Sequence, residues 1–288
     1  MTVFRFLGGT NIPQLKATLS NLLYTKRWTP IIDYAKEACE TNTKALAAYS
    51  AMSAMIRGLD EFNESFPVAY ALKASSFRAS PDNAKLMWDL VAQVTAHDTT
   101  SVMLHAEQDS LKAYENEVYD GLIKEFNRDG VRVYKSYQMY RRDGYNLLMD
   151  DLGRYNNLGI KLVRGAYINA DSHVIHASAQ RTHAMYDRAM AECVSLITKT
   201  RGTRDIKLVV ATHNTMSVEF GERISRVNKE KVAFAQLLGM GDVLSHDLSK
   251  AKQRMVYKYV PYGTLKESIP YLARQFKENV NIVKHILS

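Results

Sequence analysis

The 288-residue chain is long enough for two small domains or for one large α/β barrel, which often reaches about 250 residues. Its hydrophobic content of 46% and charged content of 24% are typical of a globular protein, and no run approaches the roughly 18 apolar residues that a membrane span needs. The net charge of +8 comes from scattered lysines and arginines, which disfavours nucleic-acid binding. The two cysteines lack C-x-x-C spacing, which favours a reducing compartment without disulfides.

The N-terminal segment is basic, because the first 32 residues contain no acid. This makes it similar to a cleaved targeting peptide. However, residues 10–13, TNIP, predict a helix start, and an apolar stripe at helical spacing follows. The stripe consists of Leu15, Leu19, Leu22 and Leu23. We therefore interpret the segment as part of the mature fold, with a cleaved peptide as the less favoured alternative.

Short runs rich in β-branched and aromatic residues recur along the chain and alternate with helical segments such as 83–96 and 181–198. The runs are 29–34, 67–72, 100–104, 131–134, 159–163, 206–211, 231–234 and 255–260. Eight strand–helix units predict an α/β fold of the (β/α)8 barrel type, with a preceding N-terminal helix and a single domain over residues 1–288. An open doubly wound sheet is disfavoured, because no G-x-G-x-x-G follows the first strand.

Polar side chains follow or end most of the predicted strands. Active sites of such barrels lie at the carboxyl ends of the strands, so we expect these side chains to share one rim. They are Lys73, His105, Lys135, Arg164, Thr212, His213, Asn214, Gln236 and Tyr259. A barrel without a ligand would not need this arrangement.

The run 160–167, IKLVRGAY, ends a predicted strand in a cation followed by glycine. Gly165 would let the backbone approach a flat or anionic ligand, and Lys161 and Arg164 could stabilise negative charge that develops on a flavin. For the short pattern K-x-x-R-G alone, a β-bulge with two solvated cations is the favoured explanation. The cluster at 211–214, ATHN, offers a hydroxyl, an imidazole and an amide for phosphate or ribose groups, although a histidine after a strand is more often structural.

A metal site is disfavoured. His173, His176 and His183 share one segment, but no acid with H-E-x-x-H-like spacing lies between the first two. The lysines and arginines at the predicted rim would also repel a divalent ion. We therefore expect no metal.

The C-terminal segment 257–279, YKYVPYGTLKESIPYLARQFKEN, carries the sharpest pattern. Tyr271, Arg274, Gln275 and Glu278 follow i, i+3, i+4, i+7 spacing, so one helix face carries a phenol, a guanidinium, an amide and a carboxylate. The segment resembles the C-terminal signature of the proline dehydrogenase family, Y-x-P-x-G followed by Y-L-x-R-R-x-x-E-N. Similar motifs occur in the family's order from residue 4 to residue 279.

The resemblance implies a bound FAD. KLVRGAY resembles the family's flavin-binding strand, which would place Lys161 near the flavin N5; ATHN is similar to an FAD-contacting motif. FAQLLGMGD, residues 234–242, resembles the next strand end. The cofactor-binding residues expected on this basis are Lys135, Lys161, Val163, Gly165, Ala166, Tyr167, Thr212, His213, Asn214, Gln236 and Glu278.

The resemblance also implies a pocket for a cyclic amino acid. The fork of an arginine suits a carboxylate, so Arg274 is the expected clamp, paired with Glu37. The expected catalytic residues are Lys73, Tyr259 and Arg274, and the other expected substrate-binding residues are Glu37, His105, Tyr167, Leu237, Tyr271 and Gln275. By resemblance, Tyr259 favours proline over hydroxyproline.

Three positions depart from the family's pattern. Gln275 stands in place of a second clamp arginine, and His105 stands in place of the aspartate that pairs with it. The two changes together remove a whole ion pair, which avoids one stranded buried charge. Lys135 lies where relatives have an amide near the flavin pyrimidine edge, and it could favour an anionic reduced flavin.

The implied activity is oxidation of L-proline to 1-pyrroline-5-carboxylate by hydride transfer to the flavin, with a quinone as electron acceptor. Peripheral membrane contact and a mitochondrial or cytoplasmic location are further implications of the resemblance. Two alternatives remain for the site: an altered substrate such as hydroxyproline or another secondary amino acid, and a non-catalytic flavin-binding homologue.

Overall fold

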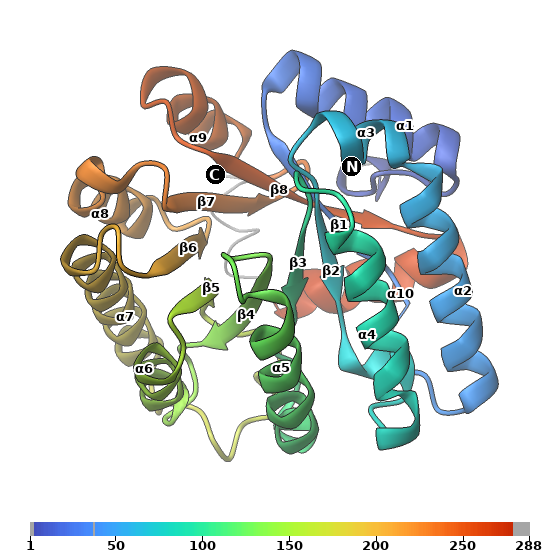
Figure 1. Cartoon of the computed structure of the whole chain (residues 1–288), viewed down its shortest axis with the longest axis horizontal. Coiled ribbons are helices and arrows are strands. Elements are labelled where there is room, and N and C mark those ends of the chain that lie inside the picture. Colours follow the sequence, from blue (N-terminus) through green and yellow to red (C-terminus); the bar gives the residue numbers. More distant parts are fainter. Residues whose placement is uncertain (1–2, 37, 279–288) are drawn as a thin grey trace.

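Eight parallel strands close into a barrel, in the order β1-β2-β3-β4-β5-β6-β7-β8, in the computed structural model. The structure describes residues 3–36 and 38–278, without the side chains of residues 3, 4, 270, 271 and 274–278. Figure 1 shows the helices around the outside of the strands. The predicted (β/α)8 barrel and its preceding N-terminal helix are confirmed.

The strands lie close to the predicted runs. Their bounds are β1 Thr29–Tyr34, β2 Ala69–Leu72, β3 Ser101–Leu104, β4 Val133–Gln138, β5 Asn157–Val163, β6 Asp205–Ala211, β7 Val232–Leu237 and β8 Val256–Tyr262. The predicted ends of β4 and β7, at residues 134 and 234, are wrong by four and three residues. Both strands continue through polar residues, which a search for apolar runs treats as a strand's end.

Helices pack around the barrel, and Leu272 of the last helix belongs to the inner core. Their bounds are α1 Ile12–Ser20, α2 Asn42–Gly58, α3 Asp60–Ser65, α4 Pro81–Thr95, α5 Lys112–Phe126, α6 Gly144–Arg154, α7 Ala179–Lys199, α8 Thr215–Ile224, α9 Asp242–His246 and α10 Leu265–Glu278. The predicted helix start at residues 10–13 is confirmed, since the side chain of Asn11 caps α1 through the Gln14 amide.

Strand alternation creates two apolar cores. On β1, Ile32 packs outward against the helices, and Ile31 packs inside the barrel. The inner core includes Tyr134 and Tyr257, and it has little spare room. A Cβ on Gly159 would lie 2.6 Å from the ring of Tyr134, so only glycine fits opposite this tyrosine on β5.

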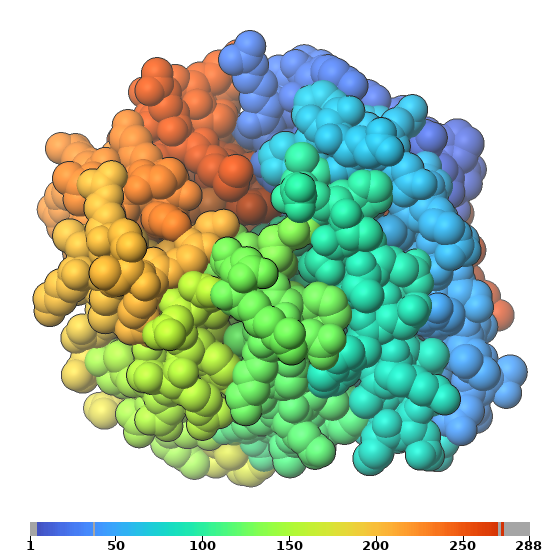
Figure 2. Space-filling view, viewed as in Figure 1, coloured from blue at the N-terminus to red at the C-terminus, as the bar shows by residue number. Residues whose placement is uncertain are grey.

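The N-terminal segment packs against the last units of the barrel. The Gly8 amide donates to the carbonyl of Pro261 on β8. The indole of Trp28 donates to Ser249 at 3.0 Å, after α9. Figure 2 shows the red segment near residue 250 beside the blue N-terminal segment. These contacts bring the two ends of the described chain together around the barrel.

Three buried or half-buried arginines, each just before a strand, cap helix C-termini. Arg132 donates to carbonyls at the end of α4, and Arg204 does so at the end of α6. Arg254 donates to the carbonyls of Glu222 and Ser225 at the end of α8. A helix leaves its last carbonyls without partners and carries partial negative charge there, so a guanidinium satisfies both needs.

Arg254→Met is expected to destabilise the fold by roughly 2–3 kcal/mol, because it leaves buried carbonyls without donors. Arg226→Met is the matched control, because Arg226 lies on the turn after α8, next to the carbonyls that Arg254 contacts. Arg226 is exposed and lies 3.9 Å from Glu222, so its loss should change stability by less than about 0.5 kcal/mol. Urea unfolding of both variants measures the difference. Equal midpoints would show that the Arg254 contacts contribute nothing.

Candidate active site

A buried ion pair lies inside the barrel at the carboxyl end of the strands. Asp33 on β1 and Lys73 after β2 both face the axis, and Nζ of Lys73 lies 3.0 Å from Oδ1 of Asp33. Both side chains are at most 2% exposed. Lys73 also donates to the carbonyl of Tyr34 at 3.2 Å. The pair holds a positive and a negative group inside the barrel, just below its rim, where solvent does not screen the interaction between them.

Lys161 on β5 adds a second buried cation to this layer. Burial lowers the pKa of Lys161 to about 8; the Asp33 carboxylate opposes this shift, and Lys73 contributes to it. Its Nζ lies 5.1 Å from the centroid of the Tyr259 ring, within the range of a cation–π contact. The lowered pKa means that this amine can change its charge near neutral pH.

The hydroxyl of Tyr259 on β8 lies 2.8 Å from Nε2 of His105, which follows β3. The two rings are 5.5 Å apart between centroids. The hydrogen bond spans the barrel mouth and fixes the orientation of the phenol. The structure therefore brings four predicted residues, Lys73, His105, Lys161 and Tyr259, into one layer inside the barrel.

Arg164 organises the rim between β5 and β6. It donates to Oγ1 of Thr212 at 2.6 Å, to Oγ of Ser217 at 2.8 Å and to Nδ1 of His183 at 2.7 Å. Its guanidinium also lies over the ring of Tyr186 at 4.2 Å, and burial lowers the pKa of Arg164. Arg164 is thus a cation that hydrogen bonds to three side chains of the protein hold in place.

His213 connects the ends of β6 and β7. Burial and, to a lesser degree, Lys258 lower the pKa of His213 to about 4, so the imidazole is neutral at pH 7. Its Nε2 accepts a hydrogen bond from the Leu237 amide at 3.0 Å. Asn214 caps α8 through the Ser217 amide. The cluster predicted to bind phosphate or ribose thus has structural hydrogen bonds of its own.

Gly165 follows Arg164 in a conformation that favours glycine, with φ of +134°. A Cβ at this position would lie 2.3–2.5 Å from the ring of Tyr140. The glycine is therefore required by the protein's own packing, whether or not a ligand approaches. The sequence suggested a ligand or a β-bulge as the reason, and not the packing against Tyr140.

The structure corrects the predictions for Lys135 and Gln236. Lys135 faces the helices, with Nζ 2.9 Å from Asp151 on α6. Gln236 also faces outward, where it donates to the Thr212 carbonyl and accepts from Ser245 on α9. Because β4 and β7 run further than predicted, these residues lie within the strands and on their outer faces, away from the barrel axis.

Sequence reasoning missed Asp33 and Gln138. Gln138 is the last residue of β4, faces inward by alternation with Ser136, and donates to the carbonyls of Ala106 and Glu107. Strand alternation was the available signal: on β1, Asp33 lies two residues after the inward Ile31. The inward-facing amide at this end of β4 is that of Gln138.

The remaining predicted residues divide into two groups. Val163, Ala166, Tyr167 and Leu237 are half-buried at the rim, and Leu237 packs against the inner core. The others lie outside the described residues or side chains. These are Glu37, Tyr271, Arg274, Gln275 and Glu278.

The three histidines weighed as metal ligands make separate contacts, two through their rings and one through its backbone amide. His173 contacts Asp109, His183 accepts from Arg164, and the His176 amide donates to the Tyr140 carbonyl. Over the described ranges, no group of three or more potential ligands could hold a metal ion. No helix in the described part of the chain is long and apolar enough to cross a bilayer.

These features define a (β/α)8-barrel protein with a buried, cation-rich site at the carboxyl end of its strands. A family model described as Proline dehydrogenase matches residues 17–286. The chain belongs to the proline dehydrogenase family.

Relatives in sequence carry two related names. Proline dehydrogenase 1, mitochondrial, from Drosophila melanogaster is 29% identical over 68% of this chain and 32% of that protein. The human protein of the same name is 31% identical over 68% of this chain and 35% of its own length. Hydroxyproline dehydrogenase from Xenopus laevis is 30% identical over 74% of this chain and 50% of that protein. The chain thus spans a third to a half of these relatives.

A solved structure shares the fold. Proline utilization A from Bdellovibrio bacteriovorus, inactivated by N-propargylglycine, superimposes with a TM-score of 0.81 over 94% of this chain and 32% of its own chain. The sequence identity is 19%, so the likeness concerns the fold.

Proposed function

We propose that this chain is an FAD-dependent dehydrogenase that oxidises L-proline to 1-pyrroline-5-carboxylate. The observation that carries the proposal is the inner layer of Asp33, Lys73, Lys161 and Tyr259, which combines buried charges with an aromatic wall at the carboxyl end of the barrel. The family to which the chain belongs supports the reaction.

The described rim fits a flavin. The hydroxyl of Ser136 faces the barrel interior, is buried, and has no hydrogen-bond partner among the described residues. Lys161 lies opposite Ser136 on the neighbouring strand β5, Gly165 follows the end of that strand, and Gln138 lies two residues further along β4. These groups would hold the ring system, while Thr212–Asn214 at the start of α8 would contact the phosphates or ribose. A bound flavin would supply the acceptor for the hydride.

The chain's own residues would bind and orient the substrate. The Tyr259 ring and Leu237 supply an apolar wall that excludes water. The Asp33–Lys73 pair provides fixed charges beside the substrate's ammonium and carboxylate groups. Lys161 would stabilise negative charge as it develops, and its lowered pKa allows it to exchange a proton. We assign the carboxylate clamp to Arg274 and its partner acid to Glu37.

The experiment that tests this function is anaerobic mixing of the flavin-loaded protein with L-proline. Bleaching of the flavin absorbance with formation of 1-pyrroline-5-carboxylate is expected. Hydroxyproline and N-alkyl glycines are the comparison substrates. Faster bleaching with either would reassign the substrate, and no bleaching with any of them would indicate a non-catalytic flavoprotein.

We further propose a quinone as electron acceptor, with peripheral contact of the protein with a membrane. Several relatives are named mitochondrial, which supports that location here. Reoxidation of the reduced protein by a soluble quinone, compared with oxygen, tests the acceptor.

Gln275→Arg is expected to lower the Michaelis constant for proline about 10- to 100-fold, because a charge-assisted hydrogen bond contributes about 1.5–3 kcal/mol. The double variant Gln275→Arg/His105→Asp adds the acid that would pair with the new arginine. It should bind proline at least as well as the single variant. Steady-state kinetics checks both. An unchanged Michaelis constant in both variants would show that residue 275 does not meet the carboxylate.

A further inference from the structure

We propose that Tyr140, Asp171 and Arg141 form a positioning lock that holds the loop between β5 and α7, residues 164–178, at a fixed height over the barrel mouth. The inference rests on the proposed function, because this loop carries Gly165–Tyr167, which we assign to the flavin and substrate. None of the three lock residues is expected to touch either molecule.

Tyr140 is the support beneath the loop. Its ring occupies the space in which a Cβ of Gly165 would stand, so ring and backbone are in direct contact. Its amide donates to the Arg164 carbonyl at 2.7 Å, and its carbonyl accepts from the His176 amide at 2.8 Å. Tyr140 therefore fixes the loop at both ends through its backbone and beneath Gly165 through its ring.

Asp171 connects this support to the middle of the loop. It is fully buried, and it accepts a 2.5 Å hydrogen bond from the Tyr140 hydroxyl. Its second oxygen accepts from the Asp109 amide at 2.8 Å, in the segment after β3. Its own amide donates to the Tyr167 carbonyl at 2.9 Å. Asp171 thus connects Tyr167, through its backbone amide, to the segments that follow two neighbouring strands, through its carboxylate.

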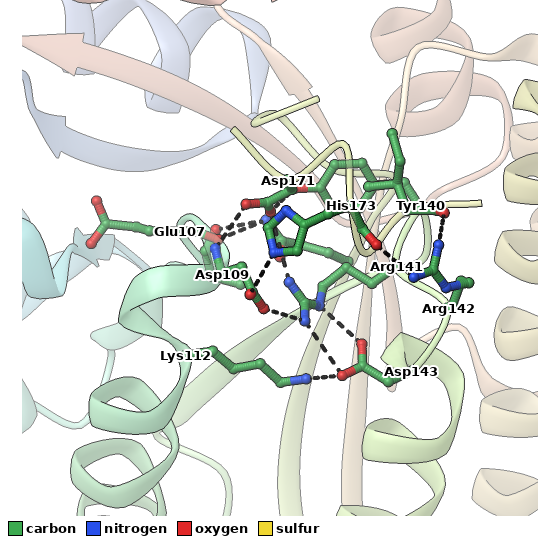
Figure 3. Close-up of polar contacts among 12 residues, drawn as sticks. Glu107, Asp109, Lys112, Tyr140, Arg141, Arg142, Asp143, Asp171 and His173 are labelled. Atoms are coloured by element: carbon green, nitrogen blue, oxygen red, sulfur yellow. Dashed lines mark hydrogen bonds and ion pairs between the residues drawn. The ribbon is translucent and has the colours of Figure 1, made fainter. Parts of the chain in front are cut away.

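Arg141 supplies a buried positive charge beside the carboxylate of Asp171. Only 7% of its side chain is exposed, and it lies 2.7 Å from Asp109, 2.9 Å from Asp143 and 3.8 Å from Asp171. Figure 3 shows its guanidinium between these acids. The positive charge of the guanidinium offsets part of the cost of burying this carboxylate. The guanidinium therefore completes the lock.

The lock is tested first without cofactor, by amide hydrogen exchange over residues 164–178. Tyr140→Phe keeps the ring beneath Gly165 and removes only the hydroxyl, and Asp171→Asn removes the charge. Each should accelerate exchange in this loop about 10-fold, as expected for loss of a hydrogen bond to a charged group. Lys112→Met is the matched control, since Lys112 contacts Asp143 in the same network and does not contact the loop. It should leave exchange unchanged.

The second arm measures FAD affinity and steady-state kinetics of the loaded variants. We expect the dissociation constant for FAD and the Michaelis constant for proline to rise about 10-fold, with kcat changing less than about 3-fold. Arg141→Met should behave in the same way, and Arg141→Lys should recover part of the affinity. A role in stability alone would instead lower the urea midpoint and leave both constants unchanged.

Two results would overturn the lock. Exchange that stays slow in both Tyr140→Phe and Asp171→Asn would show that these contacts do not hold the loop. Faster exchange with unchanged FAD affinity and an unchanged Michaelis constant would show that the position of the loop over the barrel mouth does not affect the binding of either ligand. A wild-type protein that binds no flavin would instead overturn the proposed function, and the exchange arm would still report on the lock.

Discussion

Lys161→Met is expected to stabilise the protein by about 3 kcal/mol at pH 7. Burial lowers the pKa of Lys161 to about 8 from its ordinary value of 10.5. At about 1.4 kcal/mol for each pKa unit, keeping this amine protonated inside the barrel at pH 7 costs roughly 3 kcal/mol. Methionine has a similar length and no charge to desolvate, so the variant does not bear this cost.

The gain should depend on pH in a defined direction. Between about pH 8 and pH 10.5 the unfolded chain binds more protons at this position than the folded protein does, so wild-type stability rises with pH there. The advantage of the variant therefore shrinks across that window. Urea unfolding at pH 7, 8.5 and 10 measures it. A variant no more stable than wild type at pH 7 would contradict the prediction.

The same substitution should impair the proposed chemistry. Removing one preorganised electrostatic group from an active site typically lowers the rate about 100- to 1,000-fold. Flavin reduction by proline, followed by stopped-flow absorbance, should slow by this order. A more stable but slower variant would identify Lys161 as a residue kept for function at the expense of stability.

Lys73→Met is expected to have the opposite effect and to destabilise the protein by roughly 3–5 kcal/mol. Lys73 lies 3.0 Å from Asp33, and both are almost fully buried. Removal of one partner from a buried pair leaves the other charge uncompensated. The two lysines face the same barrel interior, so they form a matched pair of substitutions with opposite expected signs. Urea midpoints at pH 7 compare them directly.

The double variant Asp33→Asn/Lys73→Met distinguishes the effect of losing the whole ion pair from the effect of losing one charged partner. It should recover at least half of the loss, because neither member of this pair stays charged without its partner, while Lys161 loses the opposing charge of Asp33 and the repulsion of Lys73 together. If Lys73→Met and the double variant lose the same free energy of unfolding, then packing of the lysine stem, rather than the ion pair, causes the destabilisation.

Much of the fold could be predicted from local patterns. The eight runs of β-branched and aromatic residues correspond to eight strands, and the first helix starts where residues 10–13 place it. Such patterns can be recognised in the sequence because the spacing of apolar residues in a strand or helix depends on which face of that segment packs against the core. Barrel closure follows from the repeated alternation of strand and helix.

Less of the site could be predicted, because it depends on where each strand ends and which way each residue faces. The strands β4 and β7 continue through polar residues, so Lys135 and Gln236 were assigned to the rim although both face the helices. A shift of one residue along a strand moves a side chain to the other face of the sheet. Gln138 was missed for the same reason, whereas Asp33 lies on a strand with correctly predicted bounds and was missed because its facing was not considered.

The sequence by itself determined the class of fold, the family resemblance and the eight runs that form the strands of the closed barrel. Only the tertiary structure decided that Gly165 is required by the ring of Tyr140, that Lys73 has a buried partner and that Lys161 is a costly cation. Each of these depends on atoms that are distant in the chain. Burial and Coulomb interactions act through space, and no local pattern records which side chains meet across a barrel.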